Sequence, residues 1–87
     1  VEKNVNEQRV TALGIRRWNT RDAGSGIFEW VYDTTTTCFL VEGRAVVTPN
    51  GGEPELVEAG DLITCGKGLK CTWWIQSPVI KHYMTHG

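Results

Sequence analysis

The 87-residue sequence lacks a long apolar run and an excess of charge of one sign. No stretch approaches the roughly 20 apolar residues that a membrane-spanning helix needs. Nine Lys and Arg balance ten Asp and Glu, for a net charge of -1, and no basic run occurs. We therefore expect neither a membrane nor a nucleic acid as partner. The length suits one domain, residues 1–87, whose small core would gain from a partner subunit.

Cysteine is scarce, and its spacing excludes the common metal and redox motifs. The three cysteines, Cys38, Cys65 and Cys71, are an odd number that matches neither a zinc ribbon nor a C-x-x-C pair. We expect reduced, partly buried thiols in an intracellular, cytoplasmic protein. Because the sequence begins at Val1 rather than Met, organelle targeting stays open.

Residues that favour strands are abundant, whereas helix signals are few. Ten Thr, nine Val and four Trp fit a pleated sheet, and ten Gly divide the chain into short segments. Residues 1–9 are polar and are expected to form a frayed end or an edge strand. The remainder predicts eight short strands: Val10–Ile15, Ile27–Tyr32, Thr36–Val41, Arg44–Thr48, Glu55–Val57, Asp61–Cys65, Lys70–Gln76 and Val79–Thr85. This regular spacing predicts an all-β fold, an antiparallel barrel or jelly roll.

Two glycine-anchored patterns have the spacing of known motifs. The first, G-x5-W-x-Y-x3-T-x6-G, runs from Gly24 to Gly43, and the second, G-x5-G-x-G-x2-C-x3-I, runs from Gly60 to Ile75. The two cupin motifs, G-x5-H-x-H-x3-E-x6-G and G-x5-P-x-G-x2-H-x3-N, have the same spacing. The 16 residues between the two patterns suit a short hairpin.

Three further runs extend this likeness: FEWVYDTTTTCFLVEG at Phe28–Gly43, GLKCTW at Gly68–Trp73 and PVIKHY at Pro78–Tyr83. With them the chain resembles small single-domain, RmlC-like cupins, relatives of the ureidoglycine aminohydrolase and ethanolamine-utilisation cupins. The likeness covers residues 15–85. It implies a small jelly-roll β-barrel that pairs as a homodimer.

The residues at the metal-binding positions depart from this family pattern. Metal-binding cupins place three imidazoles and a carboxylate there, which suit Mn, Fe, Ni or Zn. The corresponding residues here are Trp30, Tyr32, Thr36 and Cys71. An indole cannot ligate, a neutral phenol and a hydroxyl ligate poorly, and one thiol does not make a site. We therefore expect no metal and no cofactor, and the missing carboxylate at Thr36 weakens any acid–base role carried over from relatives.

Strand alternation predicts which side chains share the interior. On the second motif strand, Trp74 is expected to point outward. On the last strand only one of Lys81 and His82 can face inward, and the neighbours Ile80 and Met84 favour His82. The predicted ligand-binding set is Trp30, Tyr32, Thr36, Cys38, Cys71, Trp73 and His82.

Several of these residues have simpler interpretations. Trp30 and Trp73 are more often core fillers than stacking platforms, and a buried Tyr32 hydroxyl would need a partner. An inward His is more often structural than catalytic. Cys38 and Cys71 could form a disulfide or a soft-metal pair, although inert thiols are the simpler interpretation.

Two groups of charged residues outside the motifs also have alternatives. Arg16, Arg17 and Arg21 form a small basic cluster, which is most simply solvated but could face an anionic ligand. Asp61 follows Gly60 and is expected to anchor a turn through its carboxylate.

Three functions fit the sequence. The first is a metal-free cupin that binds a small polar metabolite, carboxylate or sugar-like, inside its barrel. The second is an aminohydrolase- or isomerase-like enzyme with Cys71 as nucleophile and His82 as base. The third is a dimeric interaction protein with a filled barrel and a partner surface at Trp74. The fold alone does not choose among them.

Overall fold

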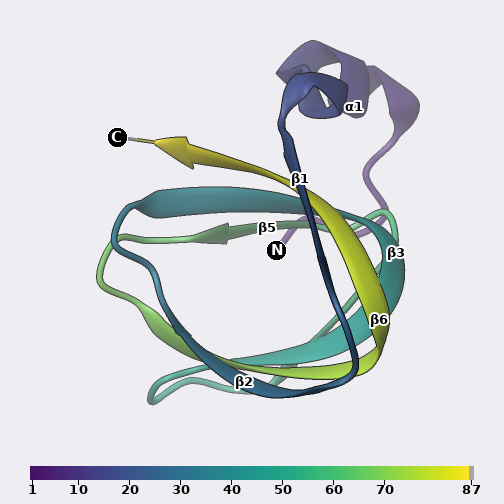
Figure 1. The fold of residues 1–87 in the computed structure, drawn as a ribbon. Coiled ribbons are helices and arrows are strands. Elements are labelled where there is room, and N and C mark those ends of the chain that lie inside the picture. The colour runs from purple at the N-terminus through teal and green to yellow at the C-terminus, as the bar shows by residue number, and fades with distance from the viewer. Residues whose placement is uncertain (87) are drawn as a thin grey trace.

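The computed structural model describes residues 1–86, and antiparallel strands dominate it (Figure 1). The elements in chain order are α1 (Glu7–Leu13), the 3-10 helix η1 (Ile15–Arg17), β1 (Asn19–Ala23), β2 (Gly26–Val31), β3 (Thr35–Pro49), β4 (Glu55–Glu58), β5 (Leu62–Cys65) and β6 (Lys70–His86). In the part of the chain described, no helix is both long and apolar enough to cross a bilayer.

Two long strands, β3 and β6, pair with each other and organise the sheet. Each also borders two short strands, so the sheet has two halves. The β1 half contains β1, the C-terminal part of β6, the N-terminal part of β3, and β5. The β2 half contains β2, the N-terminal part of β6, the C-terminal part of β3, and β4. Figure 1 shows the sheet rolling around a common interior.

The two halves meet where the register between β3 and β6 shifts, from Leu40 to Ala45. Gly43 lies in this bend with φ 95°, a conformation that side chains with a Cβ rarely adopt. A Cβ on Gly43 would lie 2.2 Å from the carbonyl oxygen of Pro78 on β6. The glycine that closes the first motif therefore allows two backbones to approach closely at the bend.

The sequence correctly predicted antiparallel strands, but it predicted too many of them and a barrel that the structure does not close. Thr36–Val41 and Arg44–Thr48 join in β3, and Lys70–Gln76 and Val79–Thr85 join in β6. Among residues 1–86, no ladder pairs the two ends of the sheet, so the sheet rolls without closing into a hydrogen-bonded barrel. One side of the interior is consequently bordered by the edge strands β1 and β2.

The predicted strand at Val10–Ile15 was wrong, because this segment belongs to α1 and η1. The Asn6 side chain caps α1 by accepting the Arg9 backbone N–H at 2.9 Å, and Gly14 ends the helix in the left-handed conformation. The edge-strand expectation for residues 1–9 holds only at Glu2, which forms an isolated bridge with Leu62.

The core has two parts, one on each face of the sheet. The inner cluster fills the interior with Tyr32, Leu40, Ala45, Val47, Val57, Ile63, Cys65, Cys71, Trp73, Ile75 and Val79. The outer cluster packs α1 and η1 on the opposite face through Val10, Ile15, Trp18 and Leu62, with Phe39 of β3 against it. Phe39 therefore marks the outer face of the β1 half, and Leu40 marks the inner face.

Asp61 anchors the turn before β5, as predicted. Its carboxylate accepts the backbone N–H groups of Glu58 and Asn4, at 2.8 and 2.9 Å, and pairs with Lys3 Nζ at 2.5 Å. Burial alone would raise the pKa of Asp61, but the hydrogen bonds outweigh it and lower the pKa. The carboxylate thus fastens the N-terminal segment to the sheet.

Candidate functional site

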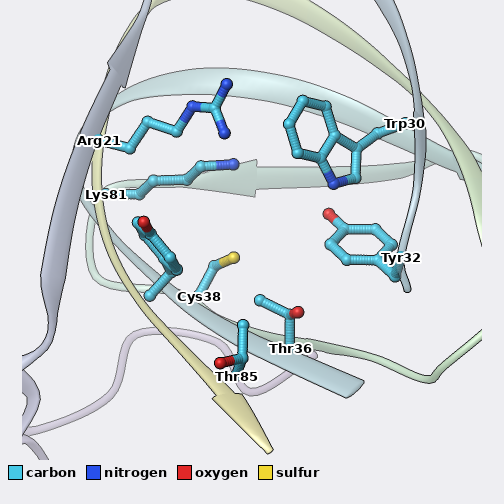
Figure 2. A pocket seen from close by; sticks show the side chains of 8 residues that line it. Arg21, Trp30, Tyr32, Thr36, Cys38, Lys81 and Thr85 are labelled. Atoms are coloured by element: carbon cyan, nitrogen blue, oxygen red, sulfur yellow. The ribbon is translucent and has the colours of Figure 1, made fainter. Parts of the chain in front are cut away.

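A cavity of about 100 Å³ opens from the interior of the β1 half (Figure 2). It is lined by Arg21, Trp30, Tyr32, Thr36, Cys38, Lys81, Tyr83 and Thr85. Four of these, Trp30, Tyr32, Thr36 and Cys38, belong to the set predicted from strand alternation. The floor is buried at Tyr32, Thr36 and Cys38, whereas Trp30 is 42 % exposed at the rim.

The aromatic residues of the cavity are held by the edge strand β2 and by β6. Trp30 lies opposite Cys71 of β6, and its ring centroid is 6.4 Å from that of Tyr32. The Trp73 Nε1–H donates to the Tyr32 hydroxyl at 3.2 Å, which supplies the partner that burial of this phenol requires. Trp73 is a core residue, as the simpler interpretation held, but Trp30 is not, since it is ten times as exposed as Trp73.

Two cations face the interior directly opposite each other. Arg21 of β1 pairs in register with Lys81 of β6, and Lys81 pairs with the buried Leu40 of β3. Since opposed residues of antiparallel strands lie on one face, both cations share the inner face with Leu40. Figure 2 shows the two side chains extending side by side toward Trp30.

The cations rest on aromatic rings rather than on carboxylates. Arg21 Cζ lies 4.6 Å from the centroid of the Trp30 ring, and Lys81 Nζ lies 4.5 Å from that of Trp73. Each distance suits a cation–π contact. Among residues 1–86, neither cation forms an ion pair.

A second, larger space of about 240 Å³ adjoins the cavity across Arg21, Trp30 and Lys81. It forms a groove along the open side of the interior, and its remaining lining is Asp22, Ala23, Phe28, Glu29, Trp73 and Ile75. Phe28 lies opposite Trp73 in the ladder and faces inward, yet it is 46 % exposed. The groove therefore presents an apolar wall beside the two cations.

The expectation that His82 faces inward was wrong. His82 pairs in register with Phe39, which packs into the outer cluster, so both lie on the outer face. Its Nδ1 lies 3.1 Å from the Thr20 hydroxyl, also on the outer face. Alternation is regular on each side of the bend in β6, so Cys71, Trp73 and Ile75 face inward before the bend, and Val79, Lys81, Tyr83 and Thr85 face inward after it.

The three cysteines are free and buried, so the disulfide considered for Cys38 and Cys71 is not formed. Only Cys38 lines the cavity. Burial raises the pKa of Cys38, and the neighbouring Lys81 charge partly opposes this. Burial and the adjacent Cys65 raise the pKa of Cys71 to about 11. A thiol that is so buried and fully protonated at neutral pH is a poor nucleophile.

The residues at the motif positions do not fit the metal ion that metal-binding cupins hold there. Of the four, Trp30 offers no ligand atom, the Thr36 hydroxyl donates to the Thr34 carbonyl at 2.9 Å, and Cys71 lies behind the cavity wall. Burial raises the pKa of Tyr32, which keeps the phenol neutral. No group of three or more His, Cys, Asp or Glu in the described chain could hold a metal ion.

Four lining residues were absent from the predicted site: Arg21, Lys81, Tyr83 and Thr85. The signal that identifies three of them was present in the sequence. Extending the parity of Cys71 and Trp73 through Pro78 selects Lys81, Tyr83 and Thr85. Arg21 could be recognised only as one of a basic cluster, since β1 itself was not predicted.

Comparison with known proteins agrees with this fold. A family model described as EutQ-like cupin domain matches residues 10–83. A DUF861 family protein from Thermotoga maritima is 34 % identical, with a TM-score of 0.92, over 97 % of this chain and 96 % of that chain.

Two more distant structures share the fold alone. The Clostridium difficile EutQ protein is 18 % identical, with a TM-score of 0.69, over 77 % of this chain and 52 % of its own. The ethanolamine utilization protein Q from Salmonella typhimurium is 21 % identical, with a TM-score of 0.68, over 76 % and 53 %. None of the curated proteins compared with the chain is significantly similar to it. With a family model that spans most of its length, the chain belongs to the EutQ-like cupin domain family.

Proposed function

We propose that this cupin binds a small polar metabolite in the interior of its rolled sheet without a metal ion. The observation that carries the proposal is the open cavity at the former ligand positions: Trp30, Tyr32 and Thr36 line a space of about 100 Å³ instead of filling it. Pockets that combine apolar walls with a few convergent polar groups are the usual binding sites of small domains.

The contacts of the cavity suit recognition better than catalysis. Hydroxyl groups of Tyr32, Thr36, Tyr83 and Thr85 and two cations surround it, and each can bond a polar ligand. The enzymatic alternative required Cys71 beside His82. These residues lie on opposite faces of the sheet, and Cys71 is closed off from both the cavity and the groove.

A thermal-shift screen of metabolites, run with and without a chelator, tests this function. We expect at least one class of small polar compound to raise the melting temperature equally in both conditions, because ligands that bind only the folded state stabilise it. Trp30→Ala should abolish that shift, while Trp74→Ala, outside the cavity, should retain it. A shift that disappears with the chelator would instead indicate a metal-dependent site.

A second role, self-association, is favoured by an apolar row on the outer face of the β2 half. Ile27, Trp74, Val46 and Leu56 are consecutive partners across β2, β6, β3 and β4. Trp74 is 50 % exposed, as its predicted outward orientation requires.

We propose that a second copy of the chain covers this row. The ion pairs Lys70–Glu29 and Arg44–Glu58, with N–O distances of 3.5 and 3.6 Å, belong to the same strands and balance in charge. A neutral, apolar surface of this kind complements itself better than it complements a charged partner. Sedimentation should show a dimer that Trp74→Lys converts to monomer, whereas a wild-type monomer at high concentration would refute the pairing.

A further inference from the structure

The pairing of Arg21 with Lys81 is unfavourable in the absence of a ligand. The two residues are direct cross-strand neighbours on the inner face, and like charges in that position repel. Among the residues that the structure describes, no carboxylate pairs with either of them. An anion between the two side chains would remove the repulsion and gain two charge-assisted hydrogen bonds.

The cavity contains no negative charge that would repel such an anion. Of the eight described residues that line it, none is acidic, and four carry hydroxyls. The acidic residues of this region, Asp22 and Glu29, line only the groove. An anionic group would therefore enter the cavity and not the groove.

The groove offers the complementary surface, one for an apolar group. Phe28 and Trp30 face inward from the edge strand β2, yet they are 46 % and 42 % exposed because the sheet does not close over them. With Trp73 and Ile75 they give the groove an apolar wall beside the cations. An aliphatic or aromatic tail in this groove would cover rings that water now contacts.

We infer that the ligand is an amphipathic carboxylate, with its head in the cavity between Arg21 and Lys81 and its tail along Phe28 and Trp73. This inference rests on the proposed function, because it names the chemical class that the same pocket takes. A carboxylate fits because its two oxygens can meet the guanidinium fork and the ammonium together. The volume of about 100 Å³ holds a small head, and the adjoining 240 Å³ holds the tail.

The four tryptophans make nuclear magnetic resonance a direct test. The indole N–H signals of Trp30 and Trp73 report on the pocket, and those of Trp18 and Trp74, which line neither space, are internal controls. Titration with butyrate, hexanoate and phenylacetate should move the first two signals alone. Affinity should rise about fourfold for each added methylene that the groove buries.

Matched probes separate the inference from the function on which it rests. Hexanamide should bind at least about tenfold more weakly than hexanoate, because it lacks the charge that the two cations attract. Equal binding of the two would overturn the carboxylate assignment but leave a small-molecule site in place. Tighter binding of hexyl phosphate than of hexanoate would also overturn the assignment. If none of these compounds moves the signals of Trp30 and Trp73 but another metabolite of the thermal-shift screen does, only the carboxylate inference is wrong. If no compound of that screen moves them either, the proposed function itself is wrong.

Paired substitutions identify the groups that hold the head. Arg21→Gln and Lys81→Gln should each weaken hexanoate binding about tenfold or more, while hexanamide binding stays the same. Arg17→Gln and Lys67→Gln are the matched controls, since neither residue lines the cavity or the groove. Well-dispersed spectra of all four variants would show that they fold. Unchanged hexanoate affinity in both Arg21→Gln and Lys81→Gln would contradict the inference.

Discussion

The two parts of strand β6 differ sharply in what they place on the inner face of the same sheet. The N-terminal part contributes Cys71, Trp73 and Ile75, all at most 4 % exposed and packed in the inner cluster. The C-terminal part contributes Lys81, Tyr83 and Thr85, which line the cavity. The N-terminal part of β6 thus contributes its inward side chains to the core, whereas the C-terminal part contributes three polar side chains to the cavity. Substitutions in the two parts should accordingly change different properties.

The largest effect on stability is expected in the N-terminal part of β6. Trp73→Ala should lower the free energy of unfolding by about 3–5 kcal/mol, because it leaves a large cavity in the core and removes the hydrogen bond to Tyr32. Chemical denaturation would measure the loss. Trp74→Ala, the adjacent but exposed residue, should cost far less, and equal losses for the two would show that the inner face had been misassigned.

A slightly smaller effect is expected where the two parts of β6 meet. Gly43→Ala should destabilise the fold by about 3 kcal/mol, since the new methyl group requires an unfavourable positive φ and collides with Pro78. Gly66→Ala is the control, because its φ is not positive and no atom lies within 4 Å of the added Cβ. Denaturation midpoints that fall equally in both variants would show that close approach at the bend is unimportant.

The pH dependence of stability should reveal the buried Cys71 thiol in the N-terminal part of β6. The pKa of Cys71 rises from 9.0 to about 11 on folding, so between these values the unfolded chain releases the proton more readily than the folded chain. Stability should therefore decline as the pH rises from about 9 toward 11. Cys71→Ala should make this decline shallower in thermal melts recorded across that range, while the raised pKa values of Cys38 and Tyr32 keep part of it. An unchanged slope would contradict the contribution of Cys71.

The smallest effect on stability is expected in the C-terminal part of β6, which lines the cavity. Lys81→Gln should change the free energy of unfolding by less than about 0.5 kcal/mol, because its ammonium forms no ion pair with residues 1–86 and repulsion from the neighbouring Arg21 offsets its contact with the Trp73 ring. A loss approaching that of Trp73→Ala would mean that Lys81 is structural, and the contrast between the two parts of β6 would fail.

Much of this architecture could be predicted from the sequence, because spacing and alternation fix it. The two motifs identified the family, and parity placed Tyr32, Cys38 and Trp73 inside and Trp74 outside, as the structure confirms. Cys38, Trp73 and Trp74 lie on strands, and Tyr32 directly follows one. At these residues, the alternation read from the sequence agrees with the buried or exposed position in the fold.

Three features could not be predicted from motif spacing and strand alternation, and each has a physical reason. The helix α1 is encoded by its caps, Asn6 and Gly14, and not by a strong apolar period. His82 was placed inward because apolar residues flank it, but Met84 is 39 % exposed and marks the outer face. Closure of the barrel depends on pairing between distant edge strands, which no local signal reports.

The metal content of the purified protein decides between a metal-free pocket and a conventional cupin centre. Cells would be grown with added manganese, iron, nickel and zinc, and the metal bound per chain would be determined by elemental analysis. A pocket built on Trp30, Tyr32 and Thr36 predicts far less than one ion per chain and a melting temperature unchanged by chelation. A full equivalent of one transition metal, lost together with thermal stability on chelation, would contradict it.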